Sequence, residues 1–322
     1  MRKAADRVRI TGQLVDATTG THLWADHFDG PLQDVFELQD RVTATVAGTI
    51  EPRLQRAEIG RARLKPVGDL GAYDLYLRGM AEFNLSTRQG YDAALAFFIQ
   101  AIERDPDYAS ALASAALCIA GRKITGGLTD SEASQAVQWA RRAAAAGRDD
   151  ATALYAAGFA VAFVGGEVES GATLIESACT LNPNLAAAWN FSGYTQLFLG
   201  KPDLAIPQFE QAMRLSPLDP YLCQFDTGIA HAHLLVGRYA DAVPWAERAA
   251  IEQPNWLPTL RALIAAYVKT GRDEDAGHAM TRLRQAFPSL RLSNVGTTLP
   301  PYRRPQDAAV FLETLRHAGL PE

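Results

Sequence analysis

The sequence predicts a mainly α-helical protein. We expect a right-handed α-solenoid of about six stacked helix pairs, with an N-terminal β-hairpin plus helix and a C-terminal capping helix. Two observations lead to this fold class. Small and aromatic residues recur in a fixed order with a period near 34 residues, and prolines close successive units at positions 183, 217, 254 and 288. Because each unit buries its apolar face only against its neighbours, several units must stack to form a stable core.

The pattern is most complete in the stretch AAAWNFSGYTQLFLGKPDLAIPQFEQAMRLSP, residues 186–217. Its defining residues are Trp189, Gly193, Ala205, Phe209, Ala212 and Pro217. The small residues let two helices approach closely, and the aromatic rings fill the space beside them. The proline ends the second helix because it lacks an N–H and clashes with the preceding turn. This order and spacing is typical of a tetratricopeptide repeat, an antiparallel helix pair of about 34 residues.

Further copies place the repeat array over residues 72–288. Second-helix signatures recur at Ala94/Phe98/Ala101/Pro106, Gly171/Ile175/Ala178/Pro183, Ala242/Ala246/Ala249/Pro254 and Ala276/Met280/Leu283/Pro288. A weaker copy lacks its proline and follows the insert ITGGLTDSE; it consists of Ala136, Ala140 and Ala143. The loops GKPD, GRYAD and GRDED place glycine after the first helix, where a left-handed cap is needed, and an acidic residue at the start of the second.

Residues 1–60 indicate a small, incomplete α/β domain. Apolar and polar residues alternate over residues 7–28 around the turn sequence DATTG, which is typical of a β-hairpin. A lone hairpin is marginal in water, and we predict no strand upstream of it, so another domain or surface should complete the sheet. An apolar stripe predicts a helix over residues 32–51, which Pro52 should kink or restart.

Residues 61–71 are interpreted as a linker to the array. The arginine-rich segment RLQRAEIGRARLK beside it is either a patch for an anionic partner or, as we favour, a solvated helix end. Residues 289–322 form the other end of the protein. There, SNVGTTLPPYRRP predicts a loop, and PQDAAVFLETLRHAGLPE predicts an amphipathic helix that caps the exposed edge of the last repeat.

The composition argues against several classes of function. The 322 residues carry a net charge of −5, which disfavours non-specific binding to nucleic acid. The chain has neither a membrane-length apolar run nor a signal-peptide pattern, so we expect a cytoplasmic protein that does not bind membranes. The three cysteines are far apart in helical patterns and are expected to be buried, reduced thiols: Cys118, Cys179 and Cys223.

No motif indicates catalysis, so we expect no enzyme, no catalytic or metal-binding residue, and no cofactor. The patterns G-x-x-x-x-G-K-[ST], G-x-G-x-x-G, G-x-S-x-G, H-E-x-x-H and C-x-x-C do not occur. His231 and His233 are two residues apart and point to different sides of a helix, whereas a chelating pair on a helix needs an i, i+4 spacing.

The surface left for function is the inner wall of the solenoid, which the first helices of the repeats line. From the repeat register, we expect this groove to include Asn190, Tyr194, Phe198, Thr227, His231, Leu235, Arg261 and Lys269. Aromatic, amide and a few basic groups suit a peptide or helix from another protein or domain. The alternatives are that segments of the chain itself, or water, fill the groove. Residues 186–199 and 223–236 hold no Lys or Arg, which argues against a clamp for acidic peptide C-termini.

The block RVRITGQLVDATTGTHLWADHFDGPLQDVFELQDRVTATVAGTIEPRL resembles a segment of bacterial multidomain signalling proteins. In these proteins a class III adenylate/guanylate cyclase domain, or a winged-helix regulator domain, precedes a small domain similar to the N-terminal domain of TolB and a tetratricopeptide array. The stretches GDLGAYDLYLRGM (68–80) and LRHAGLPE (315–322) also resemble this family. The resemblance implies that this chain is the C-terminal, non-catalytic portion: a fragment, a shortened reading frame, or a natural stand-alone protein.

We therefore expect a non-catalytic interaction or scaffold module of a bacterial signalling protein, which binds a protein, a peptide or its own upstream domain in the groove. The alternative is the regulatory or dimerisation half of a cyclase-like protein whose catalytic domain is missing from this chain. In that case the unpaired edge of the hairpin would join two copies into a homodimer, because exposed strand edges invite pairing with another chain.

Overall fold

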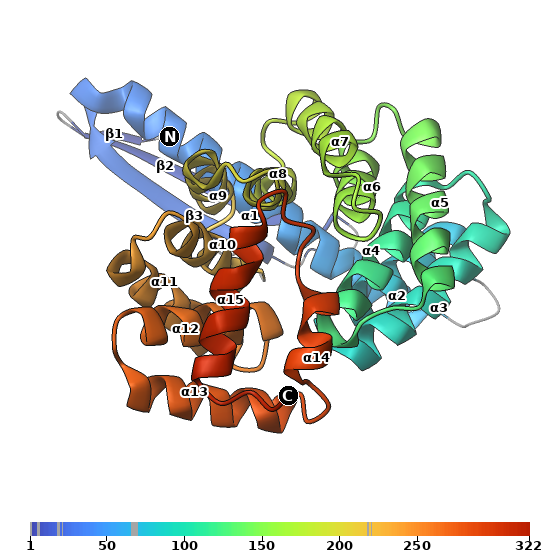
Figure 1. Ribbon diagram of the computed structural model, residues 1–322. Coiled ribbons are helices and arrows are strands. Elements are labelled where there is room, and N and C mark those ends of the chain that lie inside the picture. The colour runs from blue at the N-terminus through green and yellow to red at the C-terminus, as the bar shows by residue number, and fades with distance from the viewer. Residues whose placement is uncertain are drawn as a thin grey trace.

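The computed structural model describes residues 2–4, 7–17, 20, 22–65, 70–217, 219 and 221–322. It confirms the predicted fold class, since a small antiparallel sheet is followed by a curved stack of helix pairs (Figure 1). Within the described residues the six pairs are α2 (Ala72–Phe83) and α3 (Arg88–Arg104), α4 (Ala109–Gly126) and α5 (Asp130–Ala146), α6 (Ala151–Phe163) and α7 (Val168–Leu181), α8 (Ala186–Phe198) and α9 (Pro202–Leu215), α10 (Leu222–Leu235) and α11 (Tyr239–Glu252), and α12 (Leu257–Lys269) and α13 (Asp273–Ala286).

Phe209 shows why glycine recurs in the first helices. Its ring is fully buried between α8 and α10, against Gly193 on the first and Gly228 on the second. A Cβ atom on either glycine would overlap the ring, so glycine is what allows the two helices this close approach. Phe98 makes the same contact with Gly79 in the first helix pair. The alternation of small and aromatic residues in the sequence therefore reflects how neighbouring helices pack.

Glycine also ends four of the first helices. Gly166, Gly200, Gly237 and Gly271 follow α6, α8, α10 and α12, and their φ angles are +71°, +73°, +78° and +72°. Glycine adopts this left-handed conformation without strain. The role predicted for the GKPD, GRYAD and GRDED loops is confirmed.

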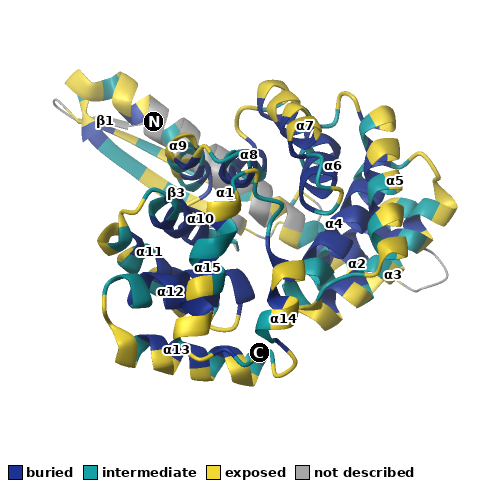
Figure 2. Ribbon diagram, viewed as in Figure 1, coloured by how far each residue is buried: buried dark blue, intermediate teal, exposed yellow. Residues whose placement is uncertain are grey.

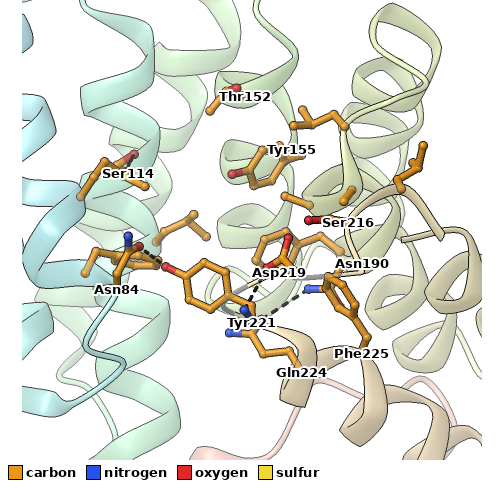
Figure 3. A pocket seen from close by; sticks show the side chains of 18 of the residues that line it. Asn84, Ser114, Thr152, Tyr155, Asn190, Ser216, Asp219, Tyr221, Gln224 and Phe225 are labelled. Atoms are coloured by element: carbon orange, nitrogen blue, oxygen red, sulfur yellow. Dashed lines mark hydrogen bonds between the residues drawn. The ribbon is translucent and has the colours of Figure 1, made fainter. Parts of the chain in front are cut away.

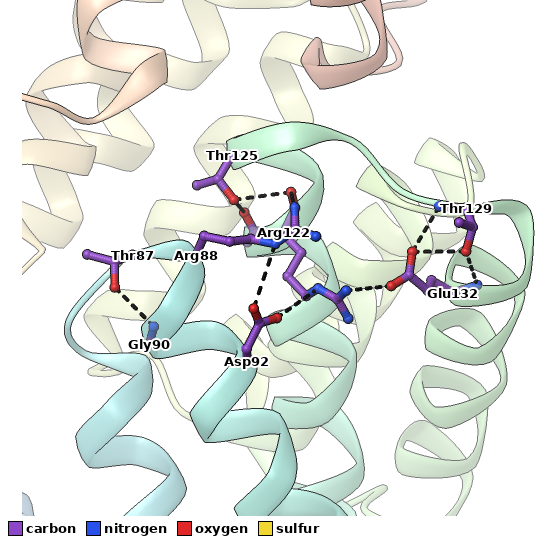
Figure 4. Close-up of polar contacts among 9 residues, drawn as sticks. Thr87, Arg88, Gly90, Asp92, Arg122, Thr125, Thr129 and Glu132 are labelled. Atoms are coloured by element: carbon purple, nitrogen blue, oxygen red, sulfur yellow. Dashed lines mark hydrogen bonds and ion pairs between the residues drawn. The ribbon is translucent and has the colours of Figure 1, made fainter. Parts of the chain in front are cut away.

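Polar contacts hold the second helix pair, which carries the weakest signature (Figure 4). Arg122 near the end of α4 forms an ion pair of 2.6 Å with Glu132 of α5. Its Nε also forms an ion pair with Asp92 of α3 at 3.1 Å, but the geometry of this contact is not that of a hydrogen bond. Glu132 also closes a capping box with Thr129 at the start of α5. The three alanines of the weak signature are fully buried: Ala136, Ala140 and Ala143.

The N-terminal sheet has the strand order β1-β2-β3, from β1 (Arg2–Ala4), β2 (Arg7–Val15) and β3 (His22–Pro31). The predicted hairpin is confirmed as β2 and β3. The expectation that no strand lies upstream is wrong, because β1 pairs with Arg7–Arg9 of β2.

Helix α1 (Val35–Leu64) follows the 3-10 turn η1 (Leu32–Asp34) and packs on β3 at one end and α2 at the other. It is longer than predicted, since it runs past Pro52 and covers the first residues of the stretch expected to be a linker. Arg78 of α2 caps its end by donating to the carbonyl oxygens of Ala62 (3.0 Å) and Lys65 (2.5 Å). This cap fixes the end of α1 to the first repeat.

The chain after the array returns over the inner side of the solenoid. The predicted loop contains the short helix α14 (Leu292–Val295) and the 3-10 turn η3 (Gly296–Thr298), and the predicted last helix is α15 (Pro305–His317). This helix packs on α12 of the last repeat, as predicted for a capping helix, and it also contacts α10 (Figure 1). The physical reason is its apolar stripe, since Phe311 and Leu315 are buried in one core with α12.

Burial distinguishes two kinds of helix (Figure 2). The second helices α5, α7 and α13 are exposed along their outer faces, whereas α6, α10 and α12 are buried on nearly all sides. A helix that is buried all round must have neighbours on both faces. The inner wall of the solenoid is therefore covered over much of its length.

Candidate functional site

Most of the predicted groove residues are buried. Six of the eight side chains belong to residues that are at most 8% exposed: Asn190, Tyr194, Phe198, Thr227, His231 and Arg261. Leu235 and Lys269 are partly exposed. All eight lie on α8, α10 and α12, as the repeat register predicts, but this part of the wall is not an open groove. Their role in binding a partner stays a prediction.

The chain's own C-terminal residues cover this part of the wall. We call residues 296–304 the strap. Arg261 on α12 donates from Nη1 to the backbone oxygen of Thr298 at 3.2 Å and to its hydroxyl oxygen at 2.9 Å. The Tyr302 ring lies edge-on to the Phe198 ring of α8, with 6.2 Å between the ring centroids. The strap thus contacts two of the predicted groove residues directly.

Two further contacts complete the cover. The backbone N–H of Arg303 donates to the carbonyl oxygen of Phe198 at 2.8 Å. Beyond the strap, the Phe311 ring of α15 lies 4.8 Å from the His231 ring, measured between centroids. In this half of the inner wall, segments of the chain itself fill much of the groove. A cavity of about 70 Å³ remains beside Phe198, His231 and Pro300 of the strap.

Arg261 and His231 carry buried polar atoms without partners. Among the described residues, Nε of Arg261 and Nε2 of His231 accept or donate no hydrogen bond. Burial lowers the pKa of Arg261 to about 10, so the guanidinium remains charged at neutral pH. Burial, with the nearby charge of Arg261, lowers the pKa of His231 to about 3, so the imidazole is neutral there.

A cavity of about 220 Å³ opens in the other half of the inner wall. We call it the front cavity (Figure 3). Its walls come from the first helices α2, α4, α6, α8 and α10, from the turn between α9 and α10, and from Arg56 of α1 and Leu215 of α9. The lining side chains include Tyr76, Phe83, Ser114, Thr152, Tyr155, Asn190, Phe191, Asp219, Tyr221, Gln224 and Phe225. Of the eight predicted groove residues, Asn190 is the one that lines this cavity.

Aromatic and amide groups dominate the chemistry of the front cavity. The rings of Tyr155 and Phe191 stack with 5.3 Å between their centroids. Asn190 donates from Nδ2 to Oε1 of Gln224 at 3.4 Å, while its own Oδ1 has no hydrogen-bond partner among the described residues. A buried acceptor left without a donor costs roughly 1–3 kcal/mol. A ligand that brings an N–H or O–H group to this position would remove that cost.

The front cavity is closed on one side by a contact between distant repeats. The hydroxyl of Tyr221 donates to Oδ1 of Asn84, which lies 137 residues earlier in the chain (Figure 3). Asp219 accepts from the backbone N–H of Tyr221 at 2.8 Å, and burial raises the pKa of its carboxyl group. The stack therefore curls until its first and fifth helix pairs meet, which turns an open wall into a cavity.

The described residues include both potential metal ligands and thiols. No group of three or more His, Cys, Asp or Glu side chains among them could hold a metal ion. The three cysteines are unpaired and buried, as predicted, and burial raises the pKa of each thiol: Cys118, Cys179 and Cys223. A thiol with a raised pKa is a poor nucleophile.

The aromatic wall of the front cavity was not predicted from the sequence. Tyr155 lies one period of 34 residues before Trp189, so the repeat register contained the signal that would have placed it on a first helix. Tyr76 and Ser114 belong to earlier repeats with irregular spacing, which gave no comparable register. Tyr221 comes from a turn, and no periodicity predicts that its side chain reaches the first repeat.

Comparisons with known proteins identify the repeat. The family model described as "Tetratricopeptide repeat" matches residues 186–217. Residues 186–217, which contain α8 and α9, therefore match a tetratricopeptide repeat, and the other helix pairs share its helix–turn–helix architecture. The chain is also 38% identical over 118 residues to "Putative adenylate cyclase 3" from Rhizobium meliloti (strain 1021). That match covers 35% of this chain and 19% of the length of the relative.

Two solved structures share the fold of this chain. The APC/C hetero-tetramer Cut9–Hcn1 matches with a TM-score of 0.58 and 14% identity, over 89% of this chain and 52% of that one. The human IFIT1 dimer with m7Gppp-AAAA matches with a TM-score of 0.57 and 15% identity, over 78% of this chain and 63% of that one. At these identities the likeness concerns the fold alone. None of the described helices is long and apolar enough to cross a membrane.

Proposed function

We propose that this chain is a non-catalytic interaction module of a bacterial signalling protein, and that it binds a segment of a partner protein, or of a domain of its own protein, in the front cavity. The cavity itself carries the proposal, because five first helices bring aromatic rings and amides to one space. Asn190 offers an unpaired acceptor there. Such a wall suits a peptide backbone and an apolar side chain better than a phosphate group or a metal ion.

The signalling context is part of the same proposal. Its support is the partial match to the Rhizobium meliloti protein, whose name refers to adenylate cyclase. We also propose that the chain is related to class III cyclase proteins, that its N-terminal sheet and helix belong to a small domain similar to the N-terminal domain of TolB, and that the protein is cytoplasmic. No cyclase activity is proposed for this chain, so incubation with ATP or GTP and Mg²⁺ should yield no cyclic nucleotide.

A peptide selection tests binding in the front cavity. Peptides selected from a random phage-displayed library on the wild-type chain should bind the Thr152→Trp variant at least about tenfold more weakly, because the indole fills the cavity. The matched control is Thr173→Trp, which places the same ring on the exposed side of α7 and should leave binding unchanged. Peptides that bind all three proteins equally, or a selection that yields no binder, would contradict the proposal.

A second candidate function is dimerisation in a cyclase-like protein through the N-terminal sheet. The observation that favours it is the short β1, which pairs with Arg7–Arg9 and leaves the rest of that edge of β2, Ile10–Val15, unpaired among the described residues. An unpaired edge can add a strand from a second copy. Light scattering of the chain with and without residues 1–30 tests this candidate. A dimer that becomes a monomer supports it, and a monomer in both cases removes it.

A further inference from the structure

The strap crosses from the last repeat to the third and fourth repeats. At one end, Thr298 is held by Arg261 of α12. At the other end, the guanidinium of Arg303 meets the carboxylate of Glu169 on α7 through two parallel contacts, of which Nε to Oε1 is 2.8 Å. The Glu169 carboxylate also has its pKa lowered to about 2, first of all by the hydrogen bond from Arg303. Such paired contacts fix geometry as well as charge.

Three side chains of the strap contact three chemically different groups of the solenoid: a guanidinium, aromatic rings and a carboxylate. Thr298 presents acceptor oxygens to the buried guanidinium of Arg261. Tyr302, four residues later, places its ring between Phe198 of α8 and Phe311 of α15, with centroids 6.2 Å from each. The next residue is the arginine that reaches the acidic group on α7. The order along the strap is therefore an acceptor, three intervening residues, an aromatic ring and an arginine.

The strap is bound as a short peptide is bound. Among the described residues, its backbone makes two hydrogen bonds to the repeats: the N–H of Arg303 donates to the carbonyl oxygen of Phe198, and the carbonyl oxygen of Thr298 accepts from Arg261. The other contacts come from side chains. Leu299 is extended (φ −77°, ψ 153°) and precedes the pair Pro300-Pro301. Prolines favour the extended polyproline conformation, which loses little entropy on binding.

The contacts of the strap differ from those of α15. Phe311 and Leu315 of α15 are at most 1% exposed and belong to the core of the last repeats. The ion pair of the strap lies at the surface, because the side chains of Arg303 and Glu169 are 42% and 64% exposed. Exposed ion pairs contribute little to stability. Thr298 and Leu299 of the strap are 2% and 7% exposed, and Leu299 belongs to the same core as α15. Release of the strap therefore exposes Leu299 and breaks the bonds to Arg261, while Phe311 and Leu315 can keep their contacts with α12.

We propose that the inner face of α8, α10 and α12, together with the start of α7, is a second binding surface, specific for a peptide with the pattern acceptor, three residues, aromatic, arginine. The strap is its resting occupant, and a partner segment of the same chemistry displaces it. Arg261, Phe198 and Glu169 do not line the front cavity, so this surface does not rest on the function proposed for that cavity.

Competition within the chain predicts how this surface behaves. An occupant tethered to its site acts at an effective concentration in the millimolar range. A free peptide therefore binds the wild-type chain weakly. When a substitution weakens the binding of the strap but leaves the surface intact, the same peptide binds more tightly. Arg303→Glu does this, because it replaces the attraction to Glu169 by repulsion and leaves the three surface residues unchanged.

A titration of full-length protein with a fluorescent peptide of residues 296–304, GTTLPPYRR, tests the proposal. We expect the Arg303→Glu variant to bind this peptide about threefold or more tightly than the wild-type chain, because an exposed ion pair contributes up to about 1 kcal/mol. The matched control is Arg272→Glu, which breaks exposed ion pairs with Asp275 and Glu247 away from the strap and should bind as the wild type does. Peptides with the tyrosine changed to alanine, or the arginine that follows it changed to glutamate, should bind the Arg303→Glu variant several-fold more weakly.

Hydrogen exchange of the same proteins provides a second readout. Added peptide should protect the inner residues of α8 and α12 in Arg303→Glu, and the variant's own strap should exchange faster than in the wild type. Equal peptide affinity for the wild-type and Arg303→Glu chains would overturn the proposal. A scrambled peptide that binds as well as GTTLPPYRR, or protection that falls outside α8 and α12, would overturn it too.

Discussion

The guanidinium of Arg303 donates two parallel hydrogen bonds to the carboxylate of Glu169, although the two residues are 134 positions apart in the sequence. This contact joins the C-terminal strap to the third repeat. The bond between Tyr221 and Asn84 joins the fifth repeat to the first in the same way. Tetratricopeptide stacks are usually described by contacts between neighbouring repeats. Here, contacts between distant repeats are present as well. The strap covers one half of the inner wall, and the other half holds the front cavity.

A methyl group at Gly228 tests the helix packing that builds the array. Gly228→Ala should lower the free energy of unfolding by about 1–3 kcal/mol, because the new Cβ overlaps the buried ring of Phe209. The matched control is Gly277→Ala on α13, where nothing lies within 4 Å of the added Cβ. There the better helix propensity of alanine should raise stability by about 1 kcal/mol. Urea unfolding measures both, and a stabilised Gly228→Ala chain would contradict this packing.

His231 should make the protein less stable as the pH falls. Its folded pKa is lowered to about 3 from an ordinary value of 6.5, so between these values the unfolded chain binds a proton that the folded chain does not. Stability is therefore complete above about pH 7 and declines below it, by about 2 kcal/mol between pH 7 and pH 5. Urea unfolding at these two pH values, both above the ordinary pKa of glutamate, measures this decline.

His231→Gln should remove most of that pH dependence. The control is His233→Gln, since the pKa of His233 is also lowered by burial but its side chain is partly exposed. The His233→Gln variant should keep most of the loss of stability between pH 7 and pH 5. An unchanged slope in His231→Gln would show that another group is responsible.

Asp226 should be a stabilising residue of α10, the helix that separates the two halves of the inner wall. Its side chain is fully buried and pairs with Arg248, whose guanidinium also lies 4.4 Å from the Trp245 ring. Asp226→Asn keeps the shape but loses charge-assisted hydrogen bonds, so we expect a loss of about 2 kcal/mol in the free energy of unfolding.

Asp203→Asn is the control for this prediction. Asp203 pairs with Arg238, and the two side chains are 75% and 44% exposed. An exposed pair should contribute less than about 1 kcal/mol. Equal losses in both variants would mean that the burial of Asp226 does not strengthen its ion pair.

The sequence predicts the features of this fold that local spacing determines. Phe209 and Gly193 contact each other within one repeat, and Gly200 caps the helix that precedes it, so a pattern of about 34 residues contains both. The sequence predicts that Pro52 kinks or restarts the helix. The helix does not restart there, because α1 is continuous from Val35 to Leu64.

The candidate site was predicted only in part, for a different physical reason. The repeat register places Asn190 and Arg261 on first helices correctly, but it carries no information on what covers them. Their cover is Tyr302 and its neighbours, which follow the last repeat in a segment without periodicity. Contacts across more than a hundred residues depend on the summed curvature of all repeats, which no single repeat specifies.

The most direct test of a solenoid with a filled half and a hollow half is the exchange rate of one backbone amide. The N–H of Arg303 bonds to the carbonyl oxygen of Phe198 at 2.8 Å only while the strap lies on the inner wall. In the wild-type chain we predict that this amide exchanges at least about a hundredfold more slowly than in an unstructured peptide. Exchange at the unprotected rate would mean that the strap is not held there and that the inner wall is open along its whole length.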